Sequence, residues 1–290
     1  MSGSYYILQN EDLYVRISSD GAQMLSINDR RTGERLLWNG NPKIWRERAP
    51  WLFPIIGKLK DDRFIYDGKP YKTPMHGFAK RMRFSNDLVG SHRRVFVLTY
   101  NDDTLAVYPW RFRLDIDYTL EGRKLTVKAV VTNLDEKTMY FSLGAHPGFV
   151  CQNGDQLDFG GLSALTYRRL EPGSHLLKHE KHTLPLDDGK LTLDGSLFTD
   201  DAVILERPEV NEIVLKKAEG ADIRFSYDSV PYFGLWSRHL PNDQIKYICL
   251  EPWLGVDDLV DADGLIEHKE GICALEHMQN CTFTIGIEVL

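Results

Sequence analysis

Apolar and polar residues alternate along much of this 290-residue chain, and this period of two constrains the fold more than any other feature. Leu13, Val15 and Ile17 alternate with polar neighbours, and residues 283–289 end the chain in the same way. Successive side chains of a β-strand point to opposite faces of a sheet. A period of two therefore predicts strands with one buried face.

Two pairs of alternating segments are separated by short turns. Residues 112–120 and 125–131 flank the turn EGRK, in which Gly122 can adopt a positive φ. Residues 213–215 and 223–227 flank the turn AEGAD. We therefore expect one hairpin over residues 112–131 and another over residues 213–227.

Helical spacing of apolar residues is almost absent, and no linker, repeat or low-complexity segment divides the chain. Closely spaced strands without helices are typical of all-β proteins. We predict one large antiparallel β-sandwich, a single domain over residues 1–290. Because the strands alternate, one sheet face is free to line a polar cleft.

Composition excludes several classes of function. The net charge is −7 and no basic block occurs, which argues against a nucleic-acid partner. No apolar run approaches the roughly 20 residues that cross a membrane, and the N-terminus lacks the features of a signal peptide. The four cysteines are scattered, as in reduced proteins. We expect a cytoplasmic protein with no membrane partner.

Three segments interrupt the alternation, namely residues 48–84, 142–150 and 248–258. In the second, His146 follows an apolar run and stands between Gly144 and the pair Pro147-Gly148. Sites are often built in loops at strand ends, so His146 is a candidate functional residue. The alternative is a strand-end histidine that is satisfied by hydrogen bonds.

The third segment places Glu251 after the apolar run 247–250 and before Pro252-Trp253. Desolvation at such a position raises the pKa of a carboxyl group, as a general base requires. The alternative is a carboxylate paired with Arg or Lys. Trp253 could offer its face to a sugar, although core packing is commoner for tryptophan. His76, in PMHGF, has the alternative of a simple turn histidine.

Motifs for metals and cofactors are missing from the sequence. His175, His179 and His182 have spacings that suit a metal only on a helix, and they lie in a polar stretch between Pro172 and Pro185. We expect a solvated surface segment there. No P-loop, GxGxxG or GxSxG motif occurs. We predict no metal and no cofactor.

Five short segments together resemble the aldose 1-epimerase (galactose mutarotase-like) family, and most of all its LacX-like branch. They are FPIIGKL, HGFAKRMRF, GAHPGF, DDAVIL and CLEPW, in this order, and the resemblance covers essentially the whole chain. It implies a mutarotase-type β-sandwich with a sugar cleft on one sheet face. The expected activity is interconversion of the α and β anomers of an aldohexose, without a cofactor.

The resemblance also implies roles for individual residues. His146 would protonate the ring oxygen and Glu251 would remove the proton of the C1 hydroxyl. His76 would support the ring oxygen or a neighbouring hydroxyl, and Asp201 would bind a hydroxyl. Trp253 is a further candidate for substrate binding.

Two alternatives stay open. Related hexose-6-phosphate epimerases hold a phosphate with arginines; one of these positions matches Arg48, and another is Lys80 in this chain, which keeps the charge but not the bidentate fork. The other alternative is a carbohydrate-binding protein or sugar sensor without catalysis. In each case the partner is a small-molecule sugar, bound by a monomer or homodimer.

Overall fold

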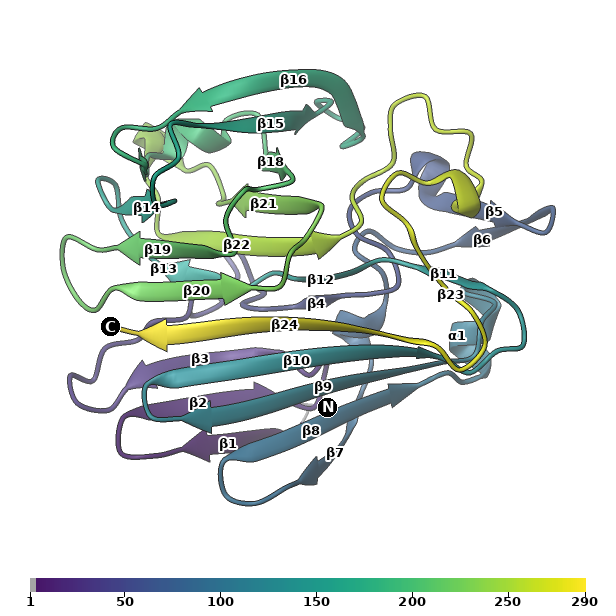
Figure 1. Ribbon diagram of the computed structural model, residues 1–290, viewed down its shortest axis with the longest axis horizontal. Coiled ribbons are helices and arrows are strands. Elements are labelled where there is room, and N and C mark those ends of the chain that lie inside the picture. Colours follow the sequence, from purple (N-terminus) through teal and green to yellow (C-terminus); the bar gives the residue numbers. More distant parts are fainter. Residues whose placement is uncertain (1–3) are drawn as a thin grey trace.

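The computed structural model describes residues 4–290, and its regular structure is almost entirely β-strand (Figure 1). One α-helix occurs among these residues, α1 (Asp102–Val107), which begins with a capping box at Asn101. Five short 3-10 helices complete the elements: Lys60–Asp62, Ala79–Arg81, Gly195–Phe198, Pro241–Asp243 and Ile266–His268. The predicted all-β class with large antiparallel sheets is confirmed.

Two large sheets contain most of the strands, and every pairing between named strands is antiparallel. The nine-stranded sheet has the order β17 (Lys190–Thr192), β14 (Gln156–Asp158), β19 (Glu212–Lys216), β20 (Ile223–Tyr227), β24 (Asn280–Val289), β10 (Lys124–Asn133), β9 (Phe112–Glu121), β8 (Arg93–Thr99) and β7 (Ser85–Leu88). The eight-stranded sheet has the order β16 (Leu177–Pro185), β15 (Ala164–Leu170), β18 (Val203–Glu206), β21 (Tyr232–Trp236), β22 (Tyr247–Leu254), β12 (Leu143–Ala145) and β4 (Trp51–Leu52), with β13 (Gly148–Val150) also paired to β22.

Three smaller sheets extend this arrangement. They are β1 (Tyr5–Gln9) with β2 (Leu13–Ser18) and β3 (Met24–Asp29), β5 (Arg63–Tyr66) with β6 (Lys69–Lys72), and β11 (Met139–Phe141) with β23 (Cys273–Leu275). Both predicted hairpins are present, β9–β10 and β19–β20. In the first, Gly122 has a φ of 51° at the turn, and burial alternates along both strands.

Aromatic side chains join the two large sheets. Phe225 of β20 contacts Phe149 of β13, with ring centroids 5.8 Å apart. Trp51 of β4 contacts Phe283 of β24 at 6.3 Å. These contacts are expected where the inner faces of two sheets interdigitate. One cluster of buried apolar residues extends from Leu8 to Val289. The single domain over residues 1–290 stays a prediction.

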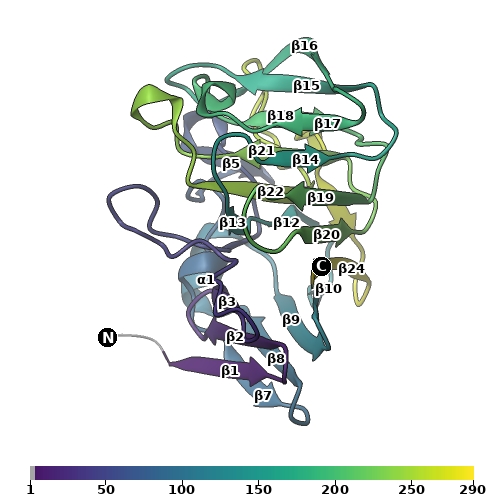
Figure 2. The ribbon, with the colours of Figure 1, turned by 90° about the vertical axis from the view of Figure 1, so that its left-hand side faces the viewer.

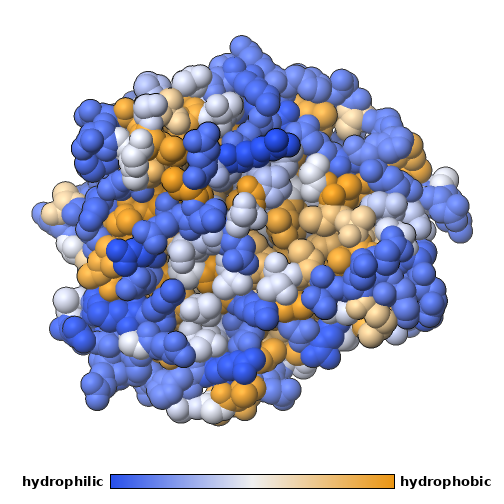
Figure 3. Space-filling model, in the orientation of Figure 1, coloured by the Kyte–Doolittle hydropathy of each residue, from blue (hydrophilic) through white to orange (hydrophobic). Residues whose placement is uncertain are grey.

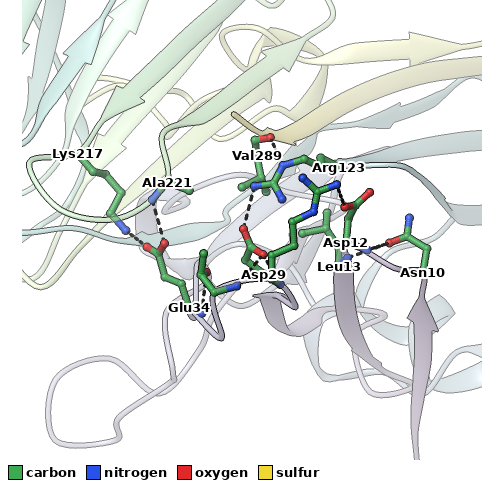
Figure 4. A network of polar contacts seen from close by, with 11 residues as sticks. Asn10, Asp12, Leu13, Asp29, Glu34, Arg123, Lys217, Ala221 and Val289 are labelled. Carbon is green, nitrogen blue, oxygen red and sulfur yellow. Dashed lines mark hydrogen bonds and ion pairs between the residues drawn. The ribbon is translucent and has the colours of Figure 1, made fainter.

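Polar contacts tie β3 and the turn after it to later parts of the chain (Figure 4). Asp29, at the end of β3, is only 1% exposed and accepts a hydrogen bond of 2.8 Å from Arg123. Glu34 pairs with Lys217 and accepts the backbone N–H of Ala221 at 2.9 Å. Figure 2 shows β1–β3 beside β7–β9, at the end of the molecule away from β15 and β16.

Hydrophilic residues predominate on the face drawn in Figure 3, with hydrophobic residues in smaller areas between them. No helix within residues 4–290 is long and apolar enough to cross a membrane. Strand β22 departs from the alternation, because all its residues from Tyr247 to Trp253 are buried. One of its faces packs on the core, and the other forms the floor of a cavity.

Candidate active site

The strand register places His146 opposite Glu251. Strand β12 pairs Gly144 with Trp253, and β13 pairs Gly148 with Cys249, so the register is the same on both sides of the gap between these strands. Within this gap, the residue opposite Glu251 is His146. Directly opposed side chains in an antiparallel pair lie close enough to interact.

The two side chains form a buried pair. His146 Nε2 lies 3.2 Å from Glu251 Oε2, and the residues are 8% and 1% exposed. Burial lowers the pKa of His146 well below its ordinary value, and the charges of His76 and Lys80 lower it further. Burial also raises the pKa of Glu251 well above its ordinary value, with help from the carboxylates of Asp201 and Asp257.

Among the described residues, Glu251 has no ion pair with Arg or Lys; its partner is His146. The alternative of a carboxylate paired with Arg or Lys is therefore not observed in this part of the chain. His146 Nδ1 and Trp253 Nε1 are buried without a hydrogen-bond partner in the described structure. Such unsatisfied polar atoms are rare in protein interiors and call for an explanation.

A cavity of about 220 Å³, which we call the inner cavity, opens above the pair. Its walls come from seven parts of the chain that lie apart in sequence. The lining residues are Trp45, Glu47, Met75, His76, His146, Leu170, His175, Asp201, Ala202, Trp236, Glu251, Trp253 and Asp257. The structure therefore brings together five of the seven predicted site residues: His76, His146, Asp201, Glu251 and Trp253.

Trp253 lies flat on the sheet and forms part of the cavity floor. A Cβ atom added at Gly144 would come within 2.6 Å of its ring, and one added at Gly234 within 2.7 Å. These glycines belong to β12 and β21, the strands on either side of β22. Glycine at both neighbours therefore makes room for the indole.

His76 is a neutral hydrogen-bond donor. Its Nδ1 accepts the backbone N–H of Gly57 at 3.1 Å, so its ring proton resides on Nε2. Burial, together with the charge of Lys80, lowers the pKa of His76 to about 3. His76 also has a φ of 63°, a strained conformation of the kind found at functional sites. His76 thus lies in a turn, as the alternative interpretation expected, and it also lines the inner cavity.

Asp201 is held by a histidine that we had expected on the surface. His175 Nδ1 lies 2.9 Å from Asp201 Oδ2, and both residues have positive φ, 56° and 68°. Arg169 fixes the backbone beneath them, because it donates to the carbonyl oxygens of Asp201 and Ala202. The segment 171–176 therefore turns toward the cavity, and only residues 177–185 form the outer strand β16.

Lys80 and Arg48 do not line the inner cavity. Lys80 Nζ lies 3.2 Å from Glu47 Oε2. Glu47 lines the cavity, so Lys80 contacts a lining residue without lining the cavity itself. The Arg48 Nε donates to the carbonyl oxygen of Asn39 at 2.9 Å. Burial lowers the pKa of Arg48 from its ordinary value, and the charge of Arg16 lowers it further.

Sequence analysis missed Trp45, Trp236 and Asp257. The Trp45 ring stacks on His146 at 5.0 Å between centroids, and it meets Trp236 edge-on at 5.4 Å. Asp257 is 2% exposed, and burial raises its pKa to about 6. Its position just after the CLEPW segment was the one available indication. Nothing near Trp45 in the sequence points to the site.

One group of donors within residues 4–290 has the geometry to approach a cation. Ligand atoms of His146, Cys249 and Glu251 lie within 4.8 Å of one another, and all three side chains are buried. Such donors suit Zn²⁺. A cation here would occupy the space between His146 Nε2 and Glu251 Oε2, which lie 3.2 Å apart. His175, His179 and His182 do not converge, because each pairs with a different carboxylate.

Comparison with known proteins gives a consistent result. The model of the aldose 1-epimerase family matches residues 4–253. The chromosomal and plasmid forms of Protein LacX from Lactococcus lactis subsp. lactis are each 33% identical to this chain, over 98% of both chains.

Solved structures agree. A galactose mutarotase-related enzyme from Lactobacillus acidophilus is 30% identical and superposes with a TM-score of 0.92, over 99% of this chain and 97% of that chain. A galactose mutarotase-like protein from Lactobacillus casei superposes with a TM-score of 0.91 over 99% of this chain and 100% of that chain. At 24% identity, this second match speaks for the fold alone.

Proposed function

The chain belongs to the aldose 1-epimerase family of isomerases, and we propose that it interconverts the α and β anomers of a neutral aldohexose by opening and reclosing the sugar ring. The single observation that carries this proposal is the separation of 3.2 Å between His146 Nε2 and Glu251 Oε2. Ring opening needs a base at the C1 hydroxyl and an acid at the ring oxygen. Both oxygens are bonded to C1, so the two groups must be neighbours.

The proposed reaction conserves protons at every step. Glu251 takes the proton of the C1 hydroxyl while His146 gives a proton to the ring oxygen, and the bond between C1 and the ring oxygen breaks. C1 becomes an aldehyde and turns about the bond to C2. Reclosure reverses both transfers on the other face of the carbonyl group. The same pair thus serves as acid and base in both directions.

The pKa directions fit a pair that holds one proton. A carboxylate and an imidazolium face the closed ring, whereas a carboxylic acid and a neutral imidazole face the open aldehyde. Burial raises the pKa of Glu251 and lowers the pKa of His146, so it favours the uncharged pair. The dry site therefore stabilises the state in which the ring is open.

The surrounding residues have separate proposed tasks. His76 donates from Nε2 to the ring oxygen or an adjacent hydroxyl as a neutral imidazole, because burial lowers its pKa to about 3. Asp201, held by His175, accepts a hydrogen bond from a hydroxyl. Trp253 on the floor and Trp45 on the wall offer flat surfaces to the C–H groups of the ring.

A phosphorylated substrate is the less favoured alternative. Of the two candidate phosphate ligands, Arg48 does not line the inner cavity, and Lys80 is paired with Glu47. Four carboxyl groups line the same space, from Glu47, Asp201, Glu251 and Asp257. They would repel a phosphate.

Polarimetry on freshly dissolved α-glucose and α-galactose tests the proposal, after correction for spontaneous mutarotation. We expect acceleration by the wild-type protein and a loss of about 10²–10⁴-fold in His146→Gln, the usual worth of acid–base catalysis. A wild-type protein that binds these sugars but does not accelerate mutarotation would be a binding protein or sensor. A preference for glucose 6-phosphate that disappears in Lys80→Ala would favour the phosphorylated substrate.

A further inference from the structure

Glu47 lines the inner cavity, but no step of the proposed reaction uses its carboxylate. Its Oε2 accepts a hydrogen bond of 3.2 Å from Lys80, whose side chain is 9% exposed. Its Oε1 accepts no hydrogen bond from any of residues 4–290. A nearly buried cation therefore holds one oxygen of Glu47, and the other oxygen is free to accept from a ligand.

Backbone pairing places Glu47 beyond His146 as seen from Glu251. In the eight-stranded sheet, β22, β12 and β4 are neighbours in this order (Figure 1). Glu251 belongs to β22, and His146 directly follows β12. The segment 48–50 runs along the other edge, because its carbonyl oxygens accept the N–H groups of His146 at 3.1 Å and of Gly148 at 2.8 Å. Glu47 precedes this segment, so the order across the cavity is Glu251, His146 and then Glu47.

The neighbours of Glu47 also lie near the imidazole of His146. Trp45, two residues before Glu47, stacks on this ring with centroids 5.0 Å apart. Lys80 follows His76 in the chain, and the rings of His76 and His146 are 5.8 Å apart. Burial lowers the pKa of both histidines, and the charge of Lys80 lowers it further. Glu47 and its partner thus belong to the histidine side of the cavity.

The atoms of an aldohexose follow the same order. In the proposed reaction, the C1 hydroxyl faces Glu251 and the ring oxygen faces His146. On the other side of the ring oxygen come C5 and then C6 with its hydroxyl group. The third position in this order belongs to Glu47, so the C6 hydroxyl is the group that meets its free oxygen.

We propose that Glu47 accepts a hydrogen bond from the C6 hydroxyl of the sugar and thereby determines specificity for sugars that carry this hydroxyl. This inference rests on the proposed function, because the roles of Glu251 and His146 set the orientation of the ring. Lys80 is a positioning residue, since it holds the carboxylate of Glu47 without lining the cavity. A site that bonds a hydroxyl group discriminates against the analogue that lacks it, because the acceptor is then left without a partner.

The same carboxylate disfavours a phosphate at C6. Its negative charge would lie next to the phosphate oxygens and repel them. Glu47→Gln removes this charge and leaves the Lys80 Nζ, which lies 3.2 Å from Oε2, without its anionic partner. We therefore expect Glu47→Gln to bind glucose 6-phosphate more tightly, relative to glucose, than the wild type does.

Two pairs of sugars that differ only at C6 provide the test. They are glucose with 6-deoxyglucose, and galactose with 6-deoxygalactose; 2-deoxyglucose, which lacks a different hydroxyl, is the control. Calorimetry measures binding, and polarimetry measures kcat/KM. We expect the wild type to prefer each parent sugar about tenfold over its 6-deoxy form, the effect of one hydrogen bond to a charged group. The side chain of Glu47 is 29% exposed, so water partly replaces a missing hydroxyl and keeps the factor in this range.

Variants then locate the effect. Glu47→Ala should remove most of the preference for the C6 hydroxyl and leave the response to 2-deoxyglucose unchanged. Lys80→Met should weaken the same preference, and Lys80→Arg should retain it, because arginine keeps the charge. Glu34→Ala is the matched control, since Glu34 is a part-buried glutamate that pairs with the nearly buried Lys217 and does not line the cavity. The preference is a ratio of two sugars on one protein, so a loss of folded protein does not change it.

Three results would overturn the assignment of Glu47. The first is equal affinity of the wild type for both members of each pair. The second is a preference for the C6 hydroxyl that survives Glu47→Ala, because Glu47 would then serve only as the partner of Lys80. The third is tighter binding of glucose 6-phosphate than of glucose by the wild type. A preference for the C6 hydroxyl in binding that depends on Glu47, in a protein that does not accelerate mutarotation, would uphold the contact and refute the proposed function.

Discussion

Glu251→Gln should remove activity and at the same time stabilise the fold. The amide has the shape of the carboxyl group but cannot take or return a proton at the C1 hydroxyl. We expect the rate of mutarotation to fall by at least 10²-fold, and by up to about 10⁴-fold, because a general base contributes this much. Affinity for the sugar should change far less, because the cavity keeps its shape.

The stability effect follows from the raised pKa of Glu251. Its carboxyl group is 1% exposed and ionises in the unfolded chain above a pKa of 4.5, whereas burial raises its pKa well above this value in the folded chain. Folding then takes up a proton, and the wild type loses about 1.4 kcal/mol of stability per pH unit above 4.5 until the pH reaches the folded pKa. Glutamine carries no such cost, so the variant should gain on the wild type as the pH rises.

Glu34→Gln is the matched control. Glu34 is a part-buried glutamate that does not line the inner cavity. It pairs with Lys217 and accepts the N–H of Ala221 (Figure 4). The same substitution there should cost about 1 kcal/mol or more through the weakened ion pair and leave mutarotation intact. The two variants thus move stability in opposite directions, and only Glu251→Gln lowers activity.

Urea unfolding at pH 5 and pH 8 and polarimetry at pH 7 measure these effects. An activity of Glu251→Gln within tenfold of the wild type would show that the base is another group. A variant less stable than the wild type at pH 8 would show that burial does not raise the pKa of Glu251. The proposal that His146 and Glu251 hold one proton between them would then also be refuted.

Three further predictions follow from the same cavity. Asp257→Asn should flatten the pH dependence of stability between pH 4 and 6, where the shift of the Asp257 pKa from 3.8 to about 6 costs the wild type about 3 kcal/mol, and urea unfolding checks it. The same variant should move the alkaline limit of activity to lower pH, because the Asp257 carboxylate raises the pKa of Glu251. His76→Asn should lower kcat/KM about tenfold without moving the acid limb of the pH–rate profile, since His76, with a pKa of about 3, stays neutral across that limb. Cd²⁺ should inhibit the wild type by binding His146, Cys249 and Glu251, and Cys249→Ala should weaken this inhibition in the polarimetric assay.

The strands were predictable because their signal is local. The alternation along residues 112–131 and 213–227 reports burial on one face, and it gave both hairpins. The order of strands in the large sheets was not predictable in this way. Strand β24, at the end of the chain, lies between β10 and β20, and nothing within any of the three segments records this arrangement.

The expected position at a strand end is confirmed for His146, which lies between β12 and β13, and is wrong for Glu251, which lies inside β22. The catalytic roles of both residues stay a prediction. Trp45 and His175 were missed, because their places depend on contacts across long stretches of chain: Trp45 stacks on His146, and His175 holds Asp201. A polar segment with three histidines was taken as solvated surface, and only its first histidine proved to face the cavity.

Strand β22 lacks the alternation of buried and exposed residues, and its burial on both faces also suits the proposed reaction. The strand that carries Glu251 is buried on both faces and reads as a continuous apolar run. The proton transfer that we propose between Glu251 and His146 needs such a dry place. Pro147 and Pro252 follow the two reactive residues and have no N–H groups to pair, while the register on either side still opposes His146 and Glu251. The positions of His146 and Glu251 are thus fixed by the strand pairs on either side, Gly144 with Trp253 and Gly148 with Cys249. A substitution that restored polar alternation to β22, such as Leu250→Lys, would break the core, whereas Cys249→Ser would wet the site and leave the sheet intact.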